Sequence, residues 1–436
     1  MNTPICDFVS RYAQSGAQRL HMPGHKGSGA LGVEALDITE ITGADSLYEA
    51  EGIIRESEEN ASALFGCPTF YSTEGSSQCI RAMLYLAMLH AKAQGRKFVV
   101  AAGRNAHKTF LSGAALLDIE VQWLYAGSQQ DYLSCPLTAA DVADQLEEGV
   151  TAVYLTAPDY LGCLPELSSI AAACHQKDAL LLVDNAHGAY LRFLKPSRHP
   201  MDLGADLCCA SAHKTLPVLT GGAYLHVADA ALAAEAKNAL ALFGSTSPSY
   251  LILQSLDRAN RILAEGFSAL LQRAAAEAAD HRAALEAAGY LFLGEEPMKW
   301  TICAKAYGYP GFGLAEALRQ KGFECEFADP DHLVLMLSPA LSIGSLRDAL
   351  LAIPRLPAIL EKPPIFSKAE RVLSVREAML SCHETLPAEA CLGRILAAPG
   401  VGCPPAVPIL ICGERIDENA LACFRYYGIE KCTVVI

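Results

Sequence analysis

Short apolar runs alternate with helical patterns between residues 97 and 225. The runs without polar alternation are residues 98–102, 121–125, 152–156, 179–183 and 207–210. Stretches with apolar residues at helical spacing, such as 139–148 and 167–177, lie between several of them. Strands that are apolar on both faces and separated by helices are typical of a mostly parallel sheet that helices cover on both sides. The pattern therefore predicts an α/β fold.

The second half of the chain has a different pattern of apolar residues. Residues 250–288 are rich in Ala, Leu, Arg and Glu at helical spacing, which predicts one or two long helices leading out of the sheet domain. Apolar runs and a helical pattern then alternate at 299–303, 313–321, 332–337 and 433–436. We expect three parts: an N-terminal segment of residues 1–45, a major domain of residues 46–288, and a smaller α+β domain of residues 289–436.

Composition narrows the class of protein. The chain has 436 residues, 52% of them hydrophobic and 19% charged, which is enough for two or three compact domains. Its net charge of −14 argues against nucleic-acid binding, which needs basic clusters. We expect neither a signal peptide nor a membrane span. The sixteen cysteines show no zinc-type spacing, so we expect free thiols, no metal, and a cytoplasmic protein.

Two blocks carry ionisable groups beside small residues. Asp184 follows the apolar run 179–183, and ligands bind at the carboxyl ends of strands in open α/β sheets, although such an aspartate can also cap a helix. Lys214 lies between two apolar segments, so we expect it to be buried, with a lowered pKa, rather than an ordinary surface lysine. An aspartate and a lysine so placed suit pyridoxal phosphate: the lysine forms the Schiff base, and the aspartate keeps the pyridine nitrogen protonated.

A phosphorylated cofactor also needs a phosphate site. Gly75, Ser76 and Ser77 precede a helical pattern, and backbone amides with hydroxyls suit a dianion, although a simple capped helix start fits the same letters. His107 follows a strand and can stack on a planar ring or serve a structural role. Residues 27–32 match a dinucleotide-binding fingerprint by letter, but we reject it because no strand precedes it and no helix clearly follows.

Together the blocks resemble the bacterial ornithine/lysine/arginine decarboxylases of the aspartate-aminotransferase fold type, particularly the short forms without an N-terminal wing domain. The resemblance covers most of the chain. It is carried by Leu20-His-Met-Pro-Gly-His-Lys-Gly, residues 38–47, Gly75-Ser-Ser, Arg104-Asn-Ala-His-Lys, Thr156-Ala-Pro-Asp-Tyr-Leu-Gly, Val183-Asp-Asn-Ala-His-Gly, Ser211-Ala-His-Lys-Thr-Leu, Ser245-Thr-Ser-Pro-Ser-Tyr and residues 403–414.

The resemblance implies a fold type I pyridoxal-phosphate enzyme, in which Lys214 is the Schiff-base lysine and Asp184 pairs with the pyridinium nitrogen. It implies that His107 stacks on the ring and that His213 is a candidate for proton handling. The loop containing Thr246 would reach the phosphate of a neighbouring subunit, which implies a homodimer with shared sites. The implied cofactor-binding residues are Gly75, Ser76, Ser77, His107, Asp184, His187, Ser211, Lys214 and Thr246. His25 lies in a matching block, but we assign it no role.

The activity implied is decarboxylation of lysine, arginine or ornithine to the amine and carbon dioxide, with a role in polyamine metabolism. Two alternatives stay open: another enzyme on this scaffold, such as an aminotransferase or carbon–sulfur lyase, and a non-catalytic paralogue. An aminotransferase needs an arginine for the substrate α-carboxylate, and Arg104 and Arg258 are candidates. In the family that this chain resembles, glutamate is common at the position of Asn185, and tyrosine is usual at the position of Cys403. The match is weak between residues 289 and 392, so the sequence leaves the substrate undecided.

Overall fold

The computed structural model describes residues 1–127, 132–398 and 407–436. The chain forms two compact units, each built from two stretches of sequence: Met1–Phe98 with Cys174–Ala269, and Val99–Ala173 with Leu270–Ile436. Residues 403–406, the first part of the block at 403–414, lie outside the described residues. The three-part division expected from the sequence stays a prediction.

The main sheet has seven strands in the order β1-β7-β6-β5-β4-β2-β3. Its strands are β1 (Thr69–Ser72), β2 (Val99–Gly103), β3 (Glu120–Leu124), β4 (Ala152–Thr156), β5 (Leu180–Asp184), β6 (Leu207–Ala210) and β7 (Ala223–Val227). β5 pairs with β6 in parallel, and β2 pairs in parallel with both β3 and β4. β7 runs antiparallel to β6 and β1 at one edge. The expectation of an α/β fold with a mostly parallel sheet is therefore confirmed.

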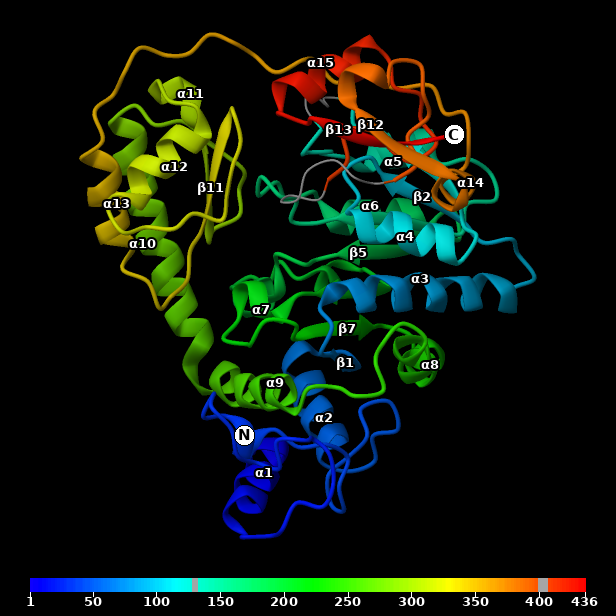
Figure 1. The fold of residues 1–436 in the computed structure, drawn as a ribbon, viewed down its shortest axis with the longest axis vertical. Coiled ribbons are helices and arrows are strands. Elements are labelled where there is room, and N and C mark those ends of the chain that lie inside the picture. The colour runs from blue at the N-terminus through cyan, green and yellow to red at the C-terminus, as the bar shows by residue number, and fades with distance from the viewer. Residues whose placement is uncertain (128–131, 399–406) are drawn as a thin grey trace. The chain divides into compact units, whose positions relative to one another are not determined.

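Helices cover the strands of the first unit. Its helices of at least two turns are α1 (Pro4–Gln14), α2 (Ile53–Phe65), α3 (Ser76–Ala93), α8 (Ala230–Ala241) and α9 (Tyr250–Ile262). α3 packs against β6, β7 and α8, and it runs alongside these strands in Figure 1. Its buried residues include Cys79, Ile80, Met83 and Leu84, whose spacing gives the helix one apolar face.

The long helical stretch expected at residues 250–288 forms two helices. α9 continues into a short π-helical segment, Leu263–Phe267, where Glu265 and Gly266 depart from helical φ and ψ. Gly266 has a φ of +95°, which glycine adopts without strain. The helical backbone resumes in α10 (Ser268–Ala287).

The second unit adds a smaller antiparallel sheet to the strands β2, β3 and β4. This sheet has the order β10-β11-β9-β8, and β12 and β13 form a separate antiparallel pair. α11 and α12 pack against β11, as Figure 1 shows. The strands are β8 (Phe292–Leu293), β9 (Lys299–Cys303), β10 (Phe327–Ala328), β11 (His332–Met336), β12 (His383–Pro387) and β13 (Lys431–Val435). The helices are α4 (Lys108–Leu116), α5 (Ala139–Gln145), α6 (Leu167–His175), α11 (Ala304–Tyr307), α12 (Gly311–Arg319), α13 (Ile343–Leu351), α14 (Val375–Leu380) and α15 (Glu418–Tyr426).

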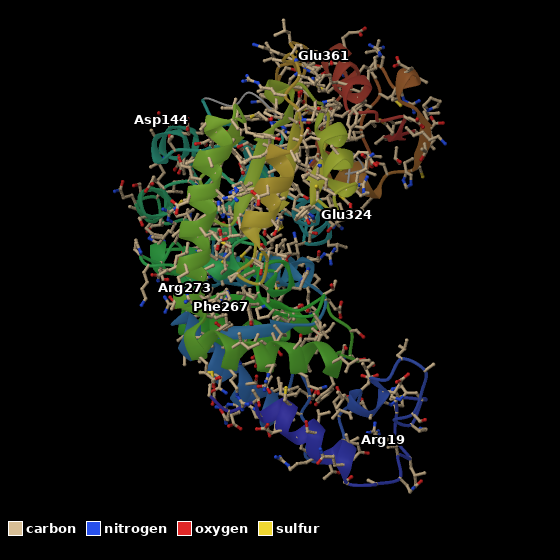
Figure 2. All side chains as sticks on the ribbon, turned by 90° about the vertical axis from the view of Figure 1, so that its left-hand side faces the viewer. Arg19, Asp144, Phe267, Arg273, Glu324 and Glu361 are labelled. Atoms are coloured by element: carbon tan, nitrogen blue, oxygen red, sulfur yellow. The ribbon has the colours of Figure 1, made fainter. Side chains whose placement is uncertain are left out.

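Hydrogen bonds hold the N-terminal segment between α1 and α2, which contains little regular structure. Arg19, labelled in Figure 2, donates to the carbonyl oxygen of Ala35 at 2.6 Å. His25 Nε2 lies 3.1 Å from Asp37 Oδ2, and its Nδ1 accepts the backbone N–H of Gly27 at 3.0 Å. His25 therefore has a structural contact within its own segment. Nowhere in the described ranges is a helix both long and apolar enough to cross a membrane.

Candidate active site

Asp184 is the last residue of β5 and is 2% exposed. Its Oδ1 accepts the backbone N–H of Ala186 at 3.1 Å and lies 3.6 Å from the Cys209 sulfur. The next helical turn, Ala189–Phe193, begins after Gly188, so the reading of Asp184 as a helix cap is wrong. The structure instead places a buried carboxylate at the carboxyl end of a strand, where open α/β sheets bind ligands.

Lys214 lies on the short helix α7 (Ala212–Thr215) and is exposed, so the expectation that it is buried is wrong. Ala212 is the buried residue of this helix, and Ser211 and Leu216 on either side of the helix are buried as well. Lys214 lies two positions after Ala212 in the helical turn and therefore falls on a different face. Its Nζ lies 3.0 Å from Nε2 of His187, which is 6% exposed. A neighbouring imidazole, rather than burial, is therefore the feature that distinguishes this lysine from an ordinary surface lysine.

The turn before α3 brings together a glycine and two serines. Gly75 precedes the helix with φ +71° and ψ −179°, a conformation that is essentially open only to glycine. Its N–H donates to the carbonyl oxygen of Gly221 at 2.7 Å. Ser76 begins the helix, and Ser211 donates its hydroxyl to the Ser76 hydroxyl at 2.8 Å. Helix amides beside two hydroxyls suit a phosphate group, and Ser77 lies in the same first turn.

His213 lies beside this turn. A Cβ added at Gly75 would be 3.9 Å from His213 Cε1. His213 Nδ1 lies 2.9 Å from the carbonyl oxygen of Gly222, and a carbonyl only accepts, so we assign the ring proton to Nδ1. Partial burial lowers the pKa of His213, and the Lys214 charge lowers it further. The neutral ring therefore has its basic nitrogen at Nε2.

Thr246 lies in the exposed segment between α8 and α9. The preceding residue, Ser245, donates its backbone N–H to the carboxylate of Glu74, directly before Gly75. Gly244 also lies close to the first turn of α3, because a Cβ added at Gly244 would clash with Gln78 of that turn and with Tyr48. The loop thus contacts the phosphate-type turn of its own unit, and its reach to a second subunit stays a prediction.

The Arg104–Lys108 block belongs to the second unit. His107 caps α4, because its Nδ1 accepts the backbone N–H of Thr109 at 3.1 Å, and its stacking role stays a prediction. Arg104 is 3% exposed and donates to the carbonyl oxygens of Pro408 and Ile409 and, at 3.2 Å, to Glu414 Oε2. This arginine therefore holds the segment 408–414.

Comparison with known proteins identifies the family. The model of the Orn/Lys/Arg decarboxylase major domain matches residues 3–293. The chain belongs to the Orn/Lys/Arg decarboxylase family. Relatives include an arginine decarboxylase of Halalkalibacterium halodurans, 29% identical over 97% of this chain and 93% of the relative. An arginine decarboxylase of Bacillus subtilis is 25% identical over 96% of this chain and 92% of its own length.

Solved structures of lysine decarboxylases share the fold. The lysine decarboxylase of Francisella novicida aligns with a TM-score of 0.79 and 15% identity, covering all of this chain and 81% of that one. The constitutive lysine decarboxylase of E. coli aligns with a TM-score of 0.75 and 16% identity, covering 100% and 82%. The expected family and the fold of fold type I pyridoxal-phosphate enzymes are confirmed.

The structure of this family member adds contacts that sequence reasoning missed. Cys209 lies against Asp184, and Glu74 binds the loop at Ser245. The signal for Cys209 was its place in the strand that follows β5 in sequence, two residues before Ser211. Neighbouring parallel strands that end together bring such residues side by side. No comparable signal marks Glu74, because its partner is a backbone amide 171 residues away.

Proposed function

We propose that this protein is a pyridoxal-phosphate-dependent decarboxylase that converts a basic L-amino acid to its amine and carbon dioxide. The observation that carries the proposal is the convergence of three features in one compact unit. They are the buried Asp184 carboxylate, the Lys214 amine beside His187, and the glycine–serine turn joined to Ser211. Membership of the Orn/Lys/Arg decarboxylase family supports the same activity.

The residues fit the cofactor. Lys214 would carry it, Asp184 would pair with the ring nitrogen, and the phosphate would lie at the helix start formed by Gly75, Ser76 and Ser77 with Ser211. His107 is the proposed stacking residue. Bound pyridoxal phosphate supplies an electron sink for the bond between Cα and the substrate carboxylate.

The chain's own groups have distinct tasks in this proposal. The buried negative charge of Asp184 favours a proton on the cofactor ring nitrogen. Because Lys214 is exposed, the α-amine of a substrate can reach it. His187 Nε2 lies 3.0 Å from Lys214 Nζ and can accept a proton from the lysine amine. The Nδ1 of His213 is hydrogen-bonded to the carbonyl oxygen of Gly222, so its Nε2 is the nitrogen that would transfer a proton at the substrate Cα.

The substrate is proposed to be arginine, lysine or ornithine, because the named relatives are arginine and lysine decarboxylases. The aminotransferase alternative is less well supported, since Arg104 is engaged with Glu414 and Arg258 is an exposed residue of α9. We further propose a cytoplasmic homodimer that supplies amines for polyamine metabolism, in which the loop containing Thr246 reaches the partner's cofactor.

The test uses the purified full chain. We expect visible absorbance from bound pyridoxal phosphate, and release of carbon dioxide from one of arginine, lysine and ornithine but not from norleucine, which lacks the positive charge. Lys214→Ala should abolish both the covalently held cofactor and the gas release, whereas Lys321→Ala, an exposed lysine of the second unit, should change neither. Transamination without release of carbon dioxide would reject the proposal in favour of the aminotransferase.

A further inference from the structure

Asp184 and Cys209 are direct partners in the parallel pairing of β5 and β6. Both strands are buried at this point, with Asp184 2% exposed and Cys209 fully buried. The Cys209 sulfur lies 3.6 Å from Asp184 Oδ1, and the N–H of Asn185 donates to the Cys209 carbonyl oxygen at 2.9 Å. The side chains of Asp184 and Cys209 are therefore in contact, and the neighbouring backbone hydrogen bond joins β5 to β6 at the same point.

The Cys209 thiol is a donor in this contact. Burial raises the pKa of Cys209 well above its usual value, and the negative charge of Asp184 raises it further, so the sulfur keeps its proton. A protonated thiol beside a carboxylate can only donate. Oδ1 of Asp184 thus receives two donors, the Cys209 thiol and the Ala186 N–H. Together they restrict rotation of the carboxylate about its χ2 angle.

We propose that Cys209 is a positioning residue for the cofactor: its thiol holds the Asp184 carboxylate in the orientation that pairs with the ring nitrogen of pyridoxal phosphate. The inference rests on the proposed function, because it assigns Asp184 to that nitrogen. It extends the site to a side chain that touches no substrate and acts only through Asp184.

Cys208 provides a matched control in the same strand. It is as fully buried as Cys209, but it pairs with Val183, and its thiol points to the carbonyl oxygen of Cys209 at 3.7 Å. Replacing either cysteine with valine removes a thiol at the same depth and changes side-chain volume by the same amount. Only the change at position 209 removes a donor to Asp184.

The experiment measures the dissociation constant of pyridoxal phosphate. Apoenzyme of the wild type, Cys209→Val, Cys209→Ser and Cys208→Val is titrated with the cofactor, and binding is followed by absorbance. We expect Cys209→Val to weaken binding about tenfold, as for a lost hydrogen bond to a charged group. Cys209→Ser, which keeps a donor, should stay within about threefold of the wild type. Cys208→Val should bind as the wild type does.

A second spectroscopic readout separates positioning from general loosening of the core. A loosened carboxylate should shift the pH at which the bound chromophore titrates in Cys209→Val but not in Cys208→Val. If Cys209→Val does not fold, Cys209→Ala takes its place and should show the same loss. Equal binding by the wild type and these variants, or an equal loss in Cys208→Val, would overturn the inference. A wild type that binds no pyridoxal phosphate would reject the proposed function itself.

Discussion

His187 Nε2 lies 3.0 Å from Lys214 Nζ, although the two residues are 27 positions apart in the chain. We predict that His187→Leu lowers kcat by about tenfold to a hundredfold, because the amine loses the neighbouring group that accepts its proton. His187→Gln keeps a hydrogen-bonding group without a titrating one. It should retain cofactor binding but share the loss of kcat, because glutamine cannot accept a proton as a base. Steady-state rates and cofactor titrations check this, and an unchanged kcat in both variants would contradict it.

Gly75 offers a prediction about the phosphate turn. Its φ of +71° and ψ of −179° are strained for any residue with a Cβ, so Gly75→Ala should destabilise the fold by about 1–3 kcal/mol and weaken cofactor binding. Gly95 follows the other end of α3 with a similar φ of +69°, and a Cβ added there would meet no atom within 4 Å. Gly95→Ala should therefore lower stability but leave the cofactor dissociation constant unchanged. Thermal unfolding and cofactor titration distinguish the two effects.

The buried pair of Arg104 and Glu414 gives a third prediction. Both side chains are nearly inaccessible, at 3% and 4%, so Arg104→Met should reduce the free energy of unfolding by about 3–5 kcal/mol. The reason is that Glu414 would keep a buried charge without its cation. Burial already raises the pKa of Glu414.

A double variant and an exposed pair provide the controls for Arg104. Arg104→Met combined with Glu414→Met should lose less stability than the sum of the two single changes. Arg425→Met, which breaks an exposed ion pair with Glu389, should lose much less stability than Arg104→Met, because solvent screens the exposed pair. Urea denaturation measures all of these variants, and additive losses at Arg104 and Glu414 would contradict coupling between them.

His199 makes stability depend on pH. Complete burial lowers its pKa from the ordinary 6.5 to about 3, with a smaller contribution from the charge of Arg192. Above pH 6.5 the ring is neutral in both the folded and unfolded states. As pH falls from 6.5 towards 3, only the unfolded state takes up the proton, so stability is progressively lost.

The matching variant is His199→Asn, because asparagine can still cap the helical turn that begins at Pro200. Between pH 6.5 and pH 5.5 the wild type should lose about 1 kcal/mol more free energy of unfolding than this variant. Denaturation curves at the two pH values provide the measurement. Identical losses in the two proteins would show that His199 does not titrate differently in the folded state.

Much of the fold could be predicted because the central strands are buried on both faces. The apolar runs at 152–156 and 207–210 coincide with β4 and β6, and those for β2, β3 and β5 are displaced by one residue. The strands β1 and β7, which pair in antiparallel fashion, were not predicted. β1 reads Thr-Phe-Tyr-Ser, which mixes polar and aromatic residues, and β7 follows two glycines in a segment without a helical crossover.

The sequence indicated which residues form the candidate site, but it did not indicate how their side chains are arranged. Asp184 and the Gly75 turn lie where the strand and helix patterns placed them. The apolar residues around Lys214 suggested burial, but a one-turn helix places Ala212 inward and leaves the lysine exposed. The bond between Ser211 and Ser76 joins positions 135 residues apart, a separation at which a local pattern carries no information.

The contact between Arg104 and Glu414 also constrains how the chain reaches its native state. The two residues are 310 positions apart, and Glu414 lies near the end of the chain, outside the region matched by the family model. During synthesis the Arg104 guanidinium cannot meet its carboxylate until residue 414, which lies 310 positions later, has left the ribosome. A fragment ending at residue 293 would contain the whole region matched by the family model but would leave Arg104 without that carboxylate.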